Sequence, residues 1–170
     1  MPRAVKVFAE CDLSTLAPWP TPDWHLESMA TVGPERFAAL MVRAAVGDPF
    51  SESTPESAAD DLREFVQDAG AAFRPDAWLA VSDDAGEIGV VLPQAYADAP
   101  GTGTLFYVAV LPGRRGAGHG TQLHRFGLDR LRELGVRRYV GSTDERNQAM
   151  VRILARNGAD LSSRQTFYAR

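Results

Sequence analysis

A glycine-rich turn constrains this chain more than any other feature. Residues 108–123 read VAVLPGRRGAGHGTQL, an apolar strand pattern that runs into a turn and then into a helix pattern. Three glycines stand at alternate positions and two arginines precede them: Arg114, Arg115, Gly116, Gly118 and Gly120. Free N–H groups at a helix start carry partial positive charge, and glycine lets a ligand approach the backbone closely. The turn therefore predicts a site for a phosphate or pyrophosphate group.

Two common phosphate-binding turns do not fit these residues. A P-loop framed on Gly113 and Gly118 requires Lys and then Ser or Thr, but His119 and Gly120 follow. A dinucleotide-binding turn requires a third glycine where this chain has Thr121. That fold also adds several strand–helix units after its turn, and the chain after Gly120 has room for only one strand, one helix and a final strand.

A third design fits the turn. The segment resembles the acetyl-coenzyme A site of the GNAT superfamily of N-acetyltransferases, whose signature is Arg or Gln-x-x-Gly-x-Gly or Ala. Arg115-x-x-Gly118-x-Gly120 matches it, and Val110-x-Pro112 ends the strand before it. The resemblance implies that backbone N–H groups from Arg115 to Gly120 hold the cofactor pyrophosphate, helped by arginine charge.

The predicted order of elements agrees with that family over essentially the whole chain, residues 1–170. The order is strand, two helices, three strands, helix, strand, helix, strand. The expected ranges are 4–9, 34–46, 54–71, 77–81, 87–92, 104–111, 118–134, 138–143, a helix from about Asp144 to Asn157, and 166–169, with a proline-rich loop at 15–33. The resemblance implies one α/β domain of the α+β type, with a central mixed, mostly antiparallel sheet and helices on both faces. It also implies that the middle strands 104–111 and 138–143 splay apart around the pantetheine arm.

Further cofactor contacts follow from the resemblance. Backbone groups of Val108, Ala109 and Val110 correspond to the family's oxyanion-type contacts with the acetyl carbonyl and the pantetheine. Asn147 matches an asparagine that binds the cofactor arm, although an asparagine there also suits a helix cap. The full set of predicted cofactor-binding residues is Val108, Ala109, Val110, Arg114, Arg115, Gly116, Ala117, Gly118, His119, Gly120, Thr121 and Asn147.

The catalytic half departs from the family. Leu154 stands where the family has a tyrosine that protonates the leaving thiolate, and leucine has no proton to donate. Tyr107 is a candidate acid in the strand before the turn, with core packing as its alternative role. That strand contains no carboxylate, so Asp144, or its neighbour Glu145, is the candidate base. A helix N-terminal charge is the alternative reading of both carboxylates.

The three histidines give weaker signals. His119 lies inside the phosphate turn, so its ring is expected to point away from the acceptor. His124 is interpreted as a solvated helix residue. His25, beside Trp24 in the proline-rich loop, is either part of the acceptor pocket or an ordinary surface residue.

Composition limits the remaining functions. The 170 residues are 45% hydrophobic and 24% charged, which is typical of a globular domain, and a net charge of −4 argues against sequence-independent nucleic-acid binding. The single cysteine, Cys11, excludes an intrachain disulfide and is typical of a reducing cytoplasm. We expect no leader segment, because no charged-then-apolar stretch opens the sequence. The longest apolar run, residues 105–111, is too short to span a membrane. We also predict no metal site. The sequence does not decide between a monomer and a homodimer.

Two function classes follow. The first is an N-acyltransferase that moves an acetyl group from acetyl-CoA directly to a small-molecule or protein amine. The second is a non-catalytic acyl-CoA-binding sensor or partner protein, which Leu154 and the acid-free strand favour. The intact glycine turn, and the family members that activate amines through water, favour the first, which is the function that we expect.

Overall fold

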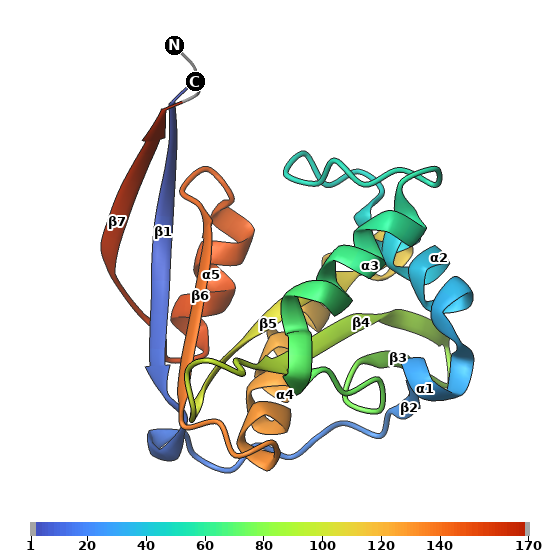
Figure 1. The fold of residues 1–170 in the computed structure, drawn as a ribbon, viewed down its shortest axis with the longest axis horizontal. Helices are drawn as coiled ribbons and strands as arrows, with labels where there is room; N and C mark the ends of the chain where they lie inside the picture. The colour runs from blue at the N-terminus through green and yellow to red at the C-terminus, as the bar shows by residue number, and fades with distance from the viewer. Residues whose placement is uncertain (1–2, 169–170) are drawn as a thin grey trace.

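A seven-stranded sheet organises residues 3–168, which are the residues that the computed structural model describes (Figure 1). Its spatial order is β2-β3-β4-β5-β6-β1-β7. The strands are β1 (Arg3–Asp12), β2 (His25–Ser28), β3 (Leu79–Asp83), β4 (Gly86–Ala95), β5 (Thr102–Val110), β6 (Arg138–Asp144) and β7 (Asp160–Tyr168). Every neighbouring pair is antiparallel except β5 and β6. The predicted mixed, mostly antiparallel sheet is therefore confirmed.

The β5–β6 junction divides the sheet into two wings. The two strands pair only at Thr102 with Arg138 and at Gly103 with Tyr139, and beyond these positions they diverge. Figure 1 shows β6, β1 and β7 on one side of the gap and β2 to β5 on the other. The predicted splay between these two middle strands is confirmed. Because neither strand pairs across the gap beyond that point, backbone groups at its edges are left for another partner.

Helices cover both faces of the sheet. On one face α2 (Pro34–Ala45) and α3 (Ala58–Ala69) bury a cluster that includes Phe37, Leu62 and Trp78. On the other face α4 (His119–Glu133) packs on β4 and β5, and α5 (Gln148–Arg156) packs beside it. The short α1 (Met29–Val32) precedes α2. Apolar residues recur at helical spacing in α2 and α4, which explains the face that each helix buries.

Several predicted boundaries differ from the structure. The segment 15–33 was expected to be loop, but its end forms β2 and α1, with β2 pairing along the edge strand β3. The helix expected from 54 begins at Ala58, because Thr54 and Ser57 exchange backbone-to-hydroxyl hydrogen bonds of 2.9 and 3.1 Å in a turn that precedes it. The last strand begins at Asp160, six residues earlier than expected, and Ala169 lies outside the described residues.

Within residues 3–168, no helix has both the length and the apolar character that crossing a membrane requires.

Candidate functional site

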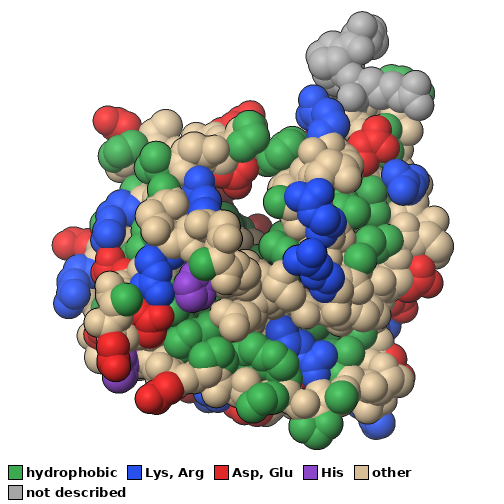
Figure 2. Space-filling view, turned by 180° about the vertical axis from the view of Figure 1, so that it is seen from behind, with side chains coloured by type: hydrophobic (Ala, Val, Ile, Leu, Met, Phe, Trp, Pro, Cys, Tyr) green, Lys and Arg blue, Asp and Glu red, His purple; other side chains and the backbone are tan. Residues whose placement is uncertain are grey.

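A cavity of about 660 Å³ opens where the glycine turn meets the gap between β5 and β6. Figure 2 shows a cleft on this side of the molecule, with Lys and Arg side chains on both of its margins. The end of β5, the turn, the start of α4, one side of α5 along its length and the loop after α2 line the cavity. Predicted cofactor residues in its wall are Val108, Ala109, Val110, Arg115, Gly116, Gly118, His119, Gly120, Thr121 and Asn147.

The turn presents free backbone donors to this cavity. Gly116 and Gly118 have φ values of 84° and 83°, a left-handed conformation that other residues rarely adopt, and Gly118 is the N-cap of α4. A Cβ built on either glycine would meet no atom within 4 Å, so the space beside both is open. In the described part of the chain, the N–H groups of Gly116, Ala117 and Gly118 have no protein acceptor. These donors at a helix start fit a pyrophosphate.

Arg115 fixes the turn in place. Its Nε donates to the Val110 carbonyl at 3.1 Å and its Nη2 to the Ala44 carbonyl at 2.8 Å, which ties the turn to β5 and α2. Its own backbone N–H donates to the Pro112 carbonyl at 3.3 Å, so that predicted pyrophosphate donor is already engaged. Arg146, Arg152 and Arg156 also line the cavity and add positive charge on the α5 side.

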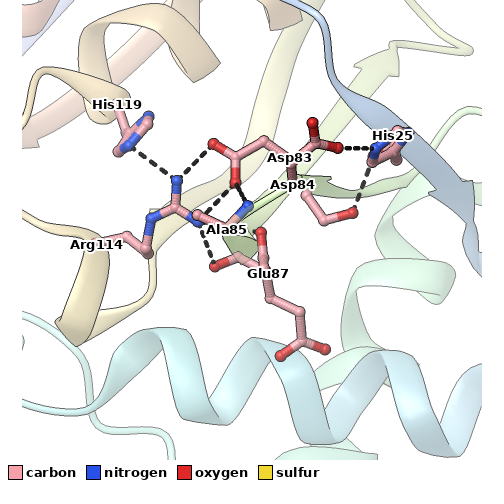
Figure 3. Close-up of polar contacts among 9 residues, drawn as sticks. His25, Asp83, Asp84, Ala85, Glu87, Arg114 and His119 are labelled. Atoms are coloured by element: carbon pink, nitrogen blue, oxygen red, sulfur yellow. Dashed lines mark hydrogen bonds and ion pairs between the residues drawn. The ribbon is translucent and has the colours of Figure 1, made fainter.

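Arg114, which was predicted to contact the cofactor, does not line the cavity. Figure 3 shows its guanidinium pointing to the β3–β4 hairpin, where Nη2 and Nη1 bind the two Asp83 carboxylate oxygens at 2.6 and 3.0 Å. This pairing lowers the pKa of the Asp83 carboxyl. His119 approaches the same guanidinium at 3.4 Å, and its buried Nδ1 has no partner among the described residues. Arg114 thus clamps the hairpin against the turn.

The edge of β5 supplies donors toward the gap. The Leu111 N–H donates to the Ile88 carbonyl of β4, and successive residues of a strand alternate in hydrogen-bonding direction. Ala109 therefore faces β4, while Val108 and Val110 face the gap. The contact of Arg115 with the Val110 carbonyl agrees with that direction. Of the three predicted oxyanion-type positions, Val108 and Val110 present their N–H groups to the cavity side.

Asn147 caps α5, and its side chain lines the cavity. Its Oδ1 accepts from the Met150 N–H at 3.2 Å, which satisfies one of the free donors at the helix start. The amide nitrogen has no protein acceptor among the described residues. The two roles predicted for this residue, helix cap and cofactor contact, are therefore compatible.

A second cavity of about 700 Å³ lies along the gap itself, between β5, β6 and β1. It shares part of its wall with the first cavity, and the shared residues are Asp48, Phe50, Val108, Asn147 and Met150. The two spaces therefore meet at the middle of the gap, beside the Val108 backbone.

The two predicted catalytic residues, and Leu154 at the position of the family's tyrosine, have different surroundings. Tyr107 lines the second cavity and packs against Phe65 at 6.3 Å between ring centroids, and burial raises its pKa to about 12. Asp144 is paired with Arg146 at 2.7 Å, and these hydrogen bonds lower its pKa to about 2, which makes it a weak base. Leu154 is 1% exposed and belongs to the core beneath the gap.

Two features escaped the sequence interpretation. Asp48, in the loop after α2, lines both cavities, and its Oδ1 accepts from the Phe50 N–H at 2.9 Å. His124 was expected to be solvated, which is wrong: it is fully buried, and burial lowers its pKa to about 4. A loop carboxylate carries no sequence signal. For His124, the only sequence signal of burial was its position next to the apolar Leu123.

His25 does not line either cavity. Its Nε2 lies 3.1 Å from an Asp84 carboxylate oxygen, and both side chains are exposed (Figure 3). Within the described residues, no group of three or more His, Cys, Asp or Glu side chains is arranged to hold a metal.

Comparisons with known proteins identify the family. The model of the acetyltransferase (GNAT) family matches residues 40–159. No curated protein matches the sequence.

Solved structures share the fold. A GCN5-related N-acetyltransferase from Sphaerobacter thermophilus is 23% identical over 96% of this chain and 50% of its own, with a TM-score of 0.67. A GNAT-family acetyltransferase from Colwellia psychrerythraea is 12% identical over 98% and 56%, with a TM-score of 0.71. A tandem GNAT protein from the clavulanic acid biosynthesis pathway is 17% identical over 96% and 53%, with a TM-score of 0.66. This chain thus spans about half the length of these proteins. By its family match and its fold, the chain belongs to the GNAT acetyltransferase family.

Proposed function

We propose that this protein is an N-acyltransferase that moves an acetyl group from acetyl-CoA directly to a primary amine. One observation carries the proposal: two cavities reach the β5–β6 gap and meet beside Val108. Such an arrangement suits a reaction in which donor and acceptor are bound together, because each has its own space and the reacting atoms come together where the spaces join.

The first cavity would hold acetyl-CoA. The free N–H groups from Gly116 to Gly118 and at the start of α4 would bind the pyrophosphate, and the cavity arginines would face its charge. The gap-facing N–H groups of Val108 and Val110 would bind the pantetheine arm and the thioester oxygen. Asn147 would donate its amide N–H to the same arm. Among the described residues, the turn and Asn147 donors have no protein acceptor, whereas the arginines contribute charge and two of them, Arg115 and Arg146, are also bound to protein groups.

The second cavity would admit the amine. Asp48 stands at the junction of the two cavities and carries a carboxylate that would attract an ammonium group, whereas Asp144 is already paired with Arg146. We therefore assign amine binding to Asp48 in place of Asp144. The reaction would take place in a reducing cytoplasm, where a lone cysteine such as the buried Cys11 stays a thiol.

The second candidate function is acyl-CoA binding without catalysis. It is favoured by Leu154, which fills the position of the family's tyrosine with core packing, and by the absence of any acid on β5. A protein of this kind would bind acyl-CoA in the first cavity and would not bind an acceptor amine in the second.

The test is release of free CoA from acetyl-CoA in the presence of a panel of small amines and peptides. We expect release above hydrolysis with at least one amine, and loss of that release in Asp48→Asn. Glu52→Gln is the matched control, because Glu52 is a carboxylate of the same loop that lines neither cavity. Tight acetyl-CoA binding with no amine-dependent release would establish the binding-only function instead.

A further inference from the structure

A buried polar cluster lies at the closed end of the gap, next to the two β5–β6 pairing positions. Tyr139 of β6 is 3% exposed, His124 of α4 is fully buried, and Asn157 at the end of α5 is 7% exposed. The Tyr139 hydroxyl oxygen lies 3.2 Å from His124 Nε2, and His124 Nδ1 lies 2.9 Å from the Asn157 amide nitrogen. None of these three residues was singled out as catalytic by the sequence.

Hydrogen bonding assigns the protons in this cluster. The Asn157 amide nitrogen donates to the Thr121 carbonyl at 3.1 Å, an oxygen that only accepts, so the orientation of the amide is fixed. The second N–H of the same nitrogen then points to His124 Nδ1, which must be unprotonated to accept it. Because burial lowers the pKa of His124 to about 4, the ring is neutral at pH 7. Its one proton is therefore on Nε2, which donates to Tyr139.

Tyr139 is left with an unused donor. Its oxygen accepts the His124 N–H, so its own O–H must donate elsewhere, and no protein acceptor for it exists among the described residues. A buried donor without an acceptor costs about 1–3 kcal/mol, so such groups are rare without a ligand or a function. Tyr139 lines the second cavity together with Leu154 and Val108. Its O–H is thus available to a group bound in the gap.

Gly141 permits this placement of the hydroxyl. The Tyr139 ring runs along β6 toward the open part of the gap, and a Cβ at Gly141 would collide with the hydroxyl oxygen. Every other residue type at this position would displace the ring. Leu154 and Tyr139 belong to the same core cluster, so the phenol comes from β6 to the region where α5 offers only leucine.

We propose that Tyr139 donates the proton that the departing CoA thiolate requires, a role that rests on the proposed acyl transfer. The ammonium group that Asp48 attracts first loses one proton to water; the neutral amine nitrogen then forms a bond to the thioester carbonyl carbon, and the C–S bond breaks with its electron pair passing to sulfur. The Tyr139 O–H proton moves to sulfur and yields the thiol. The phenolate oxygen, held by the His124 N–H, takes back the proton that the amine nitrogen loses, so no further reactant is needed.

The surroundings keep Tyr139 protonated before the reaction. Burial raises its pKa above the ordinary value for tyrosine, and Tyr96 and Cys11, the other titratable groups close to it besides His124, act in the same direction. A neutral phenol is the form that a proton donor requires, but the raised pKa also makes it a weak acid, so the transfer depends on the His124 N–H that stabilises the phenolate.

The first test removes only the hydroxyl. In Tyr139→Phe the ring stays in the core, and we expect kcat for amine-dependent CoA release to fall about 100-fold with KM for acetyl-CoA changed less than about twofold. Tyr168→Phe is the matched control, because it removes the same atom from an exposed position on β7 and should leave kcat unchanged. A Tyr139→Phe enzyme that is folded, by its melting temperature, and as active as the wild type would overturn the proposal.

A second readout separates this proposal from the proposed function. An O–H that reaches the sulfur stabilises its thiolate, so the pKa of the thiol in bound CoA should be about 1 lower in the wild type than in Tyr139→Phe. Thiolate absorbance during a pH titration of the CoA complex measures this value and requires no turnover. A wild type that transfers nothing contradicts the proposed function alone, and the titration then decides on Tyr139. Equal thiol pKa values in both proteins would contradict the role of Tyr139, whatever their activity.

Discussion

The two ends of the β5–β6 gap are built in different ways. The open end uses backbone N–H groups of one continuous segment, from the glycine turn into α4. The closed end uses side chains from β6, α4 and the end of α5, which are 15 and 33 residues apart along the chain. A site made of backbone groups requires particular residues only where φ is positive or where a side chain would not fit. Its sequence pattern is therefore local. A side-chain site is assembled by the fold, so its residues carry no local pattern.

Acid should weaken the closed end most. The pKa of His124 is about 4 in the folded protein and near 6.5 when unfolded, so between these values the unfolded chain binds more protons. The His124 contribution is therefore complete above pH 6.5 and is lost as pH falls toward 4. We expect the free energy of unfolding to drop by about 3 kcal/mol over that range.

Urea unfolding between pH 7 and pH 4 measures this effect. The matched variant is His124→Leu, which keeps an apolar side chain in the core and cannot titrate. Its stability should change much less over the same range. Parallel curves for the two proteins would show that His124 is not held neutral by burial.

At the open end, Gly118→Ala should weaken acetyl-CoA binding about 10- to 30-fold. An L-residue at a φ of 83° costs about 1–2 kcal/mol, and the turn would shift its free N–H groups to relieve this strain. Gly113→Ala is the control, because its φ is not positive and a Cβ there meets nothing within 4 Å. Calorimetric titration with acetyl-CoA compares the two. Equal affinities would mean that the turn does not hold the cofactor.

Asn147 lies between the two ends, and two substitutions separate its roles. Asn147→Ala should cost about 1 kcal/mol of stability through the lost cap, whereas Asn147→Asp keeps an acceptor for the Met150 N–H. Both variants lose the amide donor, so both should bind acetyl-CoA about five- to tenfold more weakly, from one lost hydrogen bond. Unchanged affinity in the Asp variant, measured with its melting temperature, would leave Asn147 as a cap alone.

The smallest effect is expected at Arg114, which the structure places on the hairpin side of the turn. A double-mutant cycle of Arg114→Ala and Asp83→Ala should give a coupling of about 0.5–1 kcal/mol in stability, since both side chains are partly exposed, at 20% and 26%. Acetyl-CoA affinity should stay within about twofold in both single variants. If Arg114→Ala loses affinity for acetyl-CoA and Asp83→Ala does not, Arg114 contacts the cofactor as the sequence predicted.

The fold was predictable from the sequence to the extent that its signals were periodic or local. The glycine turn and the apolar spacing of α2 and α4 followed from such signals, whereas the splayed middle strands were expected only from the resemblance to the GNAT family. The edge strand β2 did not, because three prolines precede it and its pairing with β3 comes from distant sequence. Asp48, Tyr139 and the burial of His124 also depend on tertiary contacts. The pairing of Arg114 with Asp83 joins residues 31 positions apart, so the sequence could not predict it for the same reason.

The most direct test of acyl transfer follows the acetyl group itself. Acetyl-CoA labelled with ¹³C in its acetyl carbonyl is incubated with the protein and the amine panel, and the masses of the products are measured by mass spectrometry. We expect one labelled amide for each CoA released. Release of CoA with the label found only in acetate, or no release at all, would contradict the account.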